Sequence, residues 1–104
     1  MKKHIPNFDV SKVEFEEKHE NDVYGTTTLY FIAPKEWLED LSPEADYTEI
    51  SVEYPIDRPE AIYATIMMSP TQVGKDGDLE DYDWFDIVML PSEVEQLMEL
   101  AANH

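Results

Sequence analysis

Short connections between strand-like stretches constrain the fold more than any other feature of this sequence. β-Branched and aromatic residues dominate "VYGTTTLYFIA", and apolar and charged residues alternate in "YTEISVEYP". Parallel neighbours need a crossover of a dozen or more residues, and most connections here are too short for one. We therefore expect an α+β domain with a single antiparallel sheet of about five strands. The predicted strands are residues 10–18, 23–33, 47–55, 61–69 and 82–90.

Two further segments predict helices that cover one face of this sheet. "PKEWLEDL" begins with proline, which is tolerated at the first helical position, so we expect a short helix at 34–41. A longer helix is expected at 92–102, where Ser92 and Glu95 have the spacing of a capping box. Its apolar stripe consists of Val94, Leu97, Met98 and Ala101. The length of 104 residues suits a single domain, 1–104, with one core.

An excess of acidic residues constrains the choice of partners. The chain has 24 Asp and Glu against 7 Lys and Arg, which gives a net charge of −17. Only Lys35, Arg58 and Lys75 are basic after residue 18. Such a charge repels nucleic acid and anionic membranes and attracts basic surfaces. We therefore expect no direct contact with nucleic acid or membrane, and a basic protein surface as the partner.

Residue types that carry catalysis or hold cofactors are scarce. The absence of Cys excludes disulfides, thiolate zinc sites and thiol nucleophiles. The 3 Gly residues form no phosphate-binding loop, and His4, His19 and His104 are too far apart for a paired metal motif. We predict no enzyme, no cofactor and no metal site. Since no apolar run is long enough for a signal peptide or a membrane span, a cytoplasmic location is expected.

The densest acidic stretch, "KDGDLEDYDWFD" at residues 75–86, raises three hypotheses: a cation site, a surface for a basic partner, or a solvated loop. A calcium-binding EF-hand loop places Gly at its sixth position and Glu at its twelfth. Counted from Asp76, these positions hold Asp81 and Ile87, so the pattern fails. Weak binding of divalent ions by residues 76–83 remains a minor hypothesis.

The partner hypothesis uses the carboxylates of this stretch together with the two aromatic residues Tyr82 and Trp84. Arginine pairs with carboxylates and stacks on aromatic rings, so such a row suits an arginine-rich surface. Outward-facing acids of the strand at 47–55 would extend it. The predicted partner-binding residues are Asp78, Glu80, Asp81, Asp83, Asp86, Glu49 and Glu53.

In charge and size the chain is similar to small acidic phage-encoded inhibitors, including anti-restriction and anti-CRISPR proteins. This similarity implies mimicry of nucleic acid, and it rests on composition without a shared motif. An alternative hypothesis is a small structural or assembly domain that forms a homodimer through a sheet face or edge. In that case the charge serves solubility alone.

Overall fold

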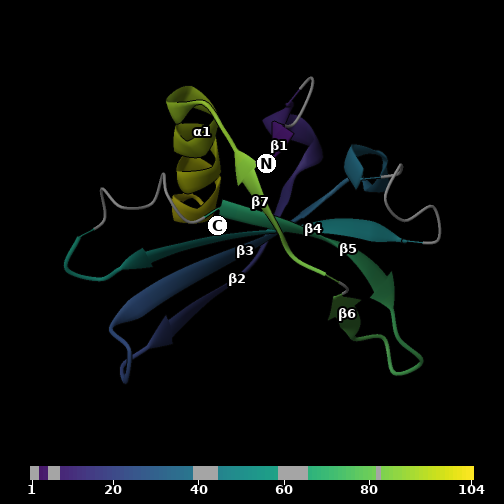
Figure 1. Cartoon of the computed structure of the whole chain (residues 1–104), viewed down its shortest axis with the longest axis horizontal. Helices are drawn as coiled ribbons and strands as arrows, with labels where there is room; N and C mark the ends of the chain where they lie inside the picture. Colours follow the sequence, from purple (N-terminus) through teal and green to yellow (C-terminus); the bar gives the residue numbers. More distant parts are fainter. Residues whose placement is uncertain (1–2, 5–7, 39–44, 59–65, 82) are drawn as a thin grey trace.

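The computed structural model describes residues 3–4, 8–38, 45–58, 66–81 and 83–104. These residues form one twisted sheet with a C-terminal α-helix beside it (Figure 1). The strands are β1 (Lys3–His4), β2 (Glu14–Asn21), β3 (Thr26–Ala33), β4 (Tyr47–Pro55), β5 (Ile66–Val73), β6 (Leu79–Asp81) and β7 (Phe85–Val88). The helical elements are the 3₁₀ turns η1 (Val10–Lys12) and η2 (Lys35–Leu38) and the α-helix α1 (Pro91–Ala102).

The strands lie in the order β1-β7-β5-β4-β3-β2, and β6 pairs with the end of β5. All pairs are antiparallel except β1 with β7, which is parallel. The predicted α+β fold, with an antiparallel sheet and a C-terminal helix, is therefore confirmed. Among the described strands, β2 is a free edge, and its mostly charged side chains oppose pairing with another chain.

The core lies between α1 and one face of the sheet. Val94 and Leu97 of α1 are fully buried there, which confirms the predicted apolar stripe. The sheet contributes alternate residues of β3, β4 and β5, because successive side chains of a strand point to opposite faces. These include Leu29, Phe31, Ile50, Val52, Ile66 and Met68.

The N-terminal part of the predicted strand at 10–18 is a 3₁₀ turn. The carboxylate of Asp9 accepts hydrogen bonds from the backbone N–H of Ser11 at 3.0 Å and from its hydroxyl at 2.7 Å. This local cap favours a turn over an extended chain. The strand β2 begins only after it, at Glu14, and continues to Asn21.

A β-bulge in β2 changes which of its side chains share a face. Phe15 pairs with Phe31, whereas Glu17 pairs with Tyr30. A bulge places an extra residue on one strand and so shifts the alternation by one. Regular alternation in a strand would place Glu17 on the same face as Phe15, and with the bulge Glu17 lies on the opposite face.

The short helix predicted at 34–41 is a 3₁₀ turn, η2, over Lys35–Leu38; residues 39–41 lie outside the described ranges. Trp37 packs partly buried against the core, and its ring centroid lies 5.6 Å from that of Phe8. The turn therefore covers the same side of the sheet as α1.

The predicted strand at 61–69 continues further than expected, since β5 passes through Pro70 to Val73; residues 61–65 are not described. Pro70 pairs with Thr48 of β4. On its other side β5 pairs with β7 at residues 67–68 and with β6 at residues 71–73. Proline fits the gap between these two pairings, because no backbone donor is needed there.

The start of α1 differs from the predicted capping box of Ser92 and Glu95. Pro91 is the first helical residue, a position that proline favours. The carboxylate of Glu93 accepts a hydrogen bond from the backbone N–H of Leu90 at 2.7 Å. The helix therefore begins one residue earlier than predicted, and Glu93 takes the part expected of Glu95.

Candidate functional site

The face of the sheet opposite α1 carries carboxylates from several strands, and we call it the acidic face. Its members follow from the strand registers and from the electrostatic contacts among their side chains. They are Glu14, Glu16, Glu17, Glu49, Glu53, Asp81 and Asp86.

One lateral row of paired residues shows how wide the acidic face is. Glu17 pairs with Tyr30, Tyr30 with Ser51, Ser51 with Met67, and Met67 with Asp86. The row therefore crosses five neighbouring strands. At about 4.8 Å between strands, its two terminal carboxylates lie about 19 Å apart across the sheet.

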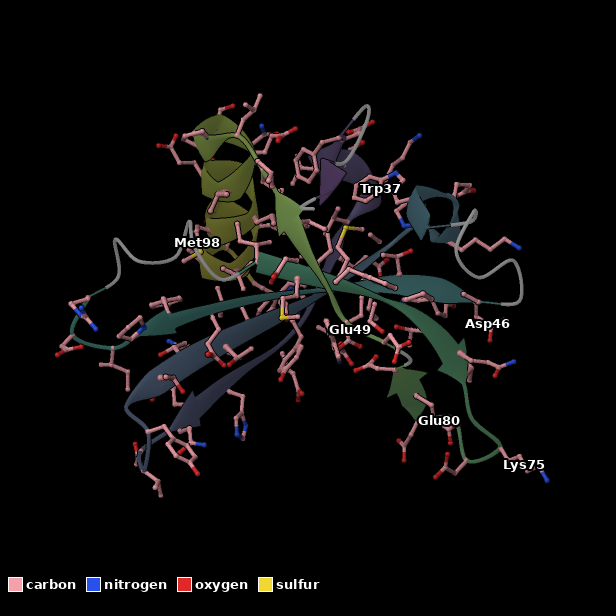
Figure 2. The ribbon with its side chains drawn as sticks, in the orientation of Figure 1. Trp37, Asp46, Glu49, Lys75, Glu80 and Met98 are labelled. Carbon is pink, nitrogen blue, oxygen red and sulfur yellow. The ribbon has the colours of Figure 1, made fainter. Side chains whose placement is uncertain are left out.

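Glu49 lies at the centre of this face. In Figure 2 it is near the middle of the molecule, on the side of the sheet away from α1 and its Met98. Its side chain was expected to point outward into solvent. It does lie on the face opposite the core, but it is only 6% exposed.

Two other carboxyl groups meet Glu49. Glu16 from the bulge of β2 and Asp81 from β6 are both hydrogen-bonded to its carboxyl group. Burial first, and then the negative charges of Asp81 and Glu16, raise the pKa of Glu49 from 4.5 to about 8. At neutral pH the protonated form of Glu49 is therefore favoured, and its hydroxyl can donate to the carboxylate of Asp81 or to that of Glu16.

Burial and nearby negative charges also raise the pKa values of the groups next to Glu49. Burial, followed by the charges of Glu17 and Asp81, raises the pKa of Glu16. The pKa of the Tyr30 hydroxyl is also raised, by burial and by the carboxylates around it, of which Glu49 has the largest effect. Tyr30 thus provides an aromatic surface within the acidic face.

The described strands place no Lys or Arg on this face, although Lys12 of η1 lies beside Glu14, and His19 shares the face by its pairing with Thr28. Lys18 pairs with Leu29 and so lies on the core side of β2, where it forms an ion pair with Glu20 at 3.3 Å. Lys35 lies in η2, and Arg58 and Lys75 lie in turns. The described strands therefore offer carboxylates on this face without a Lys or Arg among them.

Four of the seven predicted partner-binding residues lie on the acidic face: Glu49, Glu53, Asp81 and Asp86. Glu53 is exposed and accepts a hydrogen bond from the Thr28 hydroxyl at 3.4 Å. The Thr71 hydroxyl donates to the Asp81 carboxylate at 3.1 Å and orients it toward Glu49.

The other three predicted residues lie elsewhere. Glu80 pairs with Gln72 and projects from the opposite face of β6, toward the rim (Figure 2). Asp83 is exposed in the connection between β6 and β7, and Asp78 lies in the turn between β5 and β6. These carboxylates are not brought together with Glu49.

The first part of the stretch 75–86 is a hairpin turn. The Asp76 carboxylate accepts from the backbone N–H of Asp78 at 3.2 Å, which lowers the pKa of Asp76. Gly77 has a φ of 87°, and Gly74 donates to the Asp78 carbonyl at 2.7 Å. Asp and Gly at these positions therefore serve the turn itself.

Sequence reasoning missed Glu14, Glu16 and Glu17 as members of the acidic face. Lysines in the first 18 residues balance their charges, so this segment of the sequence has no net charge and does not stand out as acidic. The run "EFEE" is a signal only if the bulge is known, because the bulge decides which of its acids share a face.

Comparisons with protein-family models, curated proteins and solved structures find no match to this chain. Among the described residues, no group of three or more His, Asp or Glu is arranged to hold a metal ion. No helix in the same part of the chain is long and apolar enough to cross a membrane.

Proposed function

We propose that this chain is a non-enzymatic, cytoplasmic domain whose acidic face binds a basic protein surface in the place of nucleic acid. The observation that carries the proposal is the group of seven carboxylates that share one face of the sheet. Carboxylates of β2, β4, β6 and β7 share one face, and the described strands place no Lys or Arg among them. A protein surface that binds nucleic acid is positively charged, so the negative charge of the acidic face would attract it as nucleic acid does.

The size and charge of the domain support the same proposal. Its longest extent is 38 Å, over which a DNA duplex presents about 22 negative charges. The net charge of −17 is of that order. The aromatic ring of Tyr30 adds a surface on which an arginine side chain can stack.

A capture experiment identifies the partner. The immobilised chain is exposed to a lysate of its source organism at 0.1 M and then 0.5 M salt, and retained proteins are identified by mass spectrometry. We expect a basic nucleic-acid-binding protein that is retained at low salt, released at high salt and displaced by added DNA. Retention only of the chain itself, strengthened by salt, would favour the homodimer alternative.

Two triple variants of equal charge test the face. Glu17→Gln, Glu53→Gln and Asp86→Asn remove exposed carboxylates from the acidic face and leave Glu49 intact. We expect about a 10- to 100-fold loss of affinity and a weaker salt dependence. The control variant, Glu36→Gln with Glu95→Gln and Glu99→Gln, removes the same charge from η2 and α1. Equal losses in both variants would mean that net charge acts without a defined face.

A further inference from the structure

The turn between β2 and β3 presents two large apolar side chains to solvent. Val23 is 86% exposed and Tyr24 is 79% exposed, the highest values among the described large hydrophobic residues. Ile56, at the end of β4, is 49% exposed. The backbone N–H of Ile56 donates to the carbonyl of Gly25 at 2.9 Å, which brings it beside the turn. We call Val23, Tyr24 and Ile56 the apolar tip.

The backbone of this turn is held independently of these side chains. The side-chain oxygen of Asn21 accepts from the backbone N–H groups of Val23 at 3.0 Å and Tyr24 at 3.2 Å. Gly25 has a φ of 64°, a left-handed conformation that glycine adopts at little cost. Asn21 and Gly25 therefore specify the turn, and the fold does not require Val or Tyr between them. Turns normally carry small or polar residues there.

The apolar tip borders a hollow near one end of the acidic face. A shallow cavity of about 470 Å³ lies beside Tyr24 and Ile56 and is also lined by Asp57 and Arg58. Glu53 lies on the acidic face a short distance along β4 from this end. In Figure 1 the β2–β3 turn projects from the end of the sheet that is remote from the start of α1. A partner seated on the acidic face can therefore reach the tip.

We propose that the apolar tip is the anchor by which the domain inserts into an apolar pocket beside the basic surface of its partner protein. This inference rests on the proposed function and adds the feature that the partner must possess. Exposed aromatic side chains with a pre-formed backbone are typical of binding hot spots, where charge around them guides approach. A second copy of the chain is a poor occupant, because both copies carry −17.

Photo-crosslinking identifies the protein that contacts the apolar tip, and it does not depend on a capture experiment in which salt weakens binding. Tyr24→p-benzoylphenylalanine keeps an aromatic side chain at the tip, and Glu95→p-benzoylphenylalanine places the same probe on the exposed side of α1. We expect irradiation in a lysate of the source organism to join the first variant, and not the second, to a basic protein. No product at position 24, a product with a second copy, or a product with an acidic protein would overturn the proposal.

The affinity of the crosslinked protein then separates the tip from the acidic face. Val23→Ser with Tyr24→Ser should weaken binding by about 10- to 100-fold and leave the salt dependence unchanged. Leu90→Ser removes an exposed apolar residue at the start of α1 and should leave affinity unchanged. Wild-type affinity in the tip variant would overturn the anchor, and a loss in the acidic-face triple variant would then leave the proposed function intact.

Two measurements distinguish a protein anchor from a folding defect and from a lipid anchor. The tip variant should unfold at the temperature of the wild-type chain, since its changed side chains are mostly exposed. Sedimentation with neutral phosphatidylcholine vesicles should be absent from the wild-type chain. Vesicle binding that the tip variant loses would make the tip a lipid anchor and would overturn the inference.

Discussion

Replacing Glu49 with glutamine should remove a pH dependence from the stability of this domain. Folded Glu49 has a pKa of about 8, whereas the unfolded chain has the ordinary value of 4.5. Between these values the folded state holds a proton that the unfolded state has released. Stability should therefore fall as the pH rises from about 5 to about 8. Below pH 4.5 Glu49 is protonated in both states, so its contribution to stability no longer changes with pH.

The size of the decline follows from the same two values. At 1.36 kcal/mol per pKa unit, a gap from 4.5 to about 8 corresponds to about 5 kcal/mol. Glu49 titrates together with its neighbours, so this value describes coupled carboxyl groups and exceeds what one residue contributes. Among the described residues, Tyr30, Glu17 and Glu53 also lie around this centre. Allowing for relaxation and water, we expect a measured decline of about 2–4 kcal/mol, a large fraction of the stability of a small domain.

Urea unfolding at pH 5, 7 and 9 measures this decline. Glu49→Gln keeps the volume and supplies an amide donor to the neighbouring carboxylates, so its stability should change little between pH 6 and 9. Glu53→Gln is the matched control, since it removes a carboxylate from the same strand and face at an exposed position. It should decline like the wild-type chain. A wild-type profile that is flat above pH 6, or a Glu49→Gln profile that declines in parallel with it, would refute the reasoning.

Three further predictions concern the scaffold. Leu97→Ala, at a fully buried position of α1, should lower the free energy of unfolding by about 2–5 kcal/mol, and a loss below about 1 kcal/mol in urea would place Leu97 outside the core. Thr48→Val should raise the melting temperature, because the Thr48 hydroxyl is buried without a hydrogen-bond partner in the described structure and its removal gains about 1 kcal/mol; a lower melting temperature would reveal a partner. Gly77→Ala should lower the free energy of unfolding by about 1–2 kcal/mol, because Gly77 has a φ of 87° in the turn of the β5–β6 hairpin. Asp76→Ala removes the side-chain acceptor of the same turn and should lower the free energy of unfolding by less than that. A larger loss for Asp76→Ala than for Gly77→Ala would mean that the side chain of Asp76 holds the turn.

Elements with strong local patterns were predictable from the sequence. The alternation in "YTEISVEYP" placed a strand at 47–55, and the structure has β4 at Tyr47–Pro55. The apolar stripe placed a helix at 92–102, one residue short of α1. Both patterns are periodic over many residues, so a single irregular position does not mislead. The capping box failed because proline at the first position moves the start of the helix.

The extent of β5 and β6 could not be predicted from local signals. Pro70 normally ends a central strand, yet here it lies where neither β6 nor β7 pairs with β5. The acidic stretch at 75–86 looked like one feature. The structure divides it into a turn, a short strand, a connection and the start of β7, which point its carboxylates in different directions.

The sequence by itself determined the class of fold, the covering helix and the net charge of −17, because these depend on composition and short-range period. Only the tertiary structure decided which carboxylates share a face. Glu16, Glu49 and Asp81 are far apart in the chain and meet through a bulge in β2 and the register of β4 and β5. A shift of one residue in a strand moves every later side chain to the other face, and no local pattern of charge records that shift.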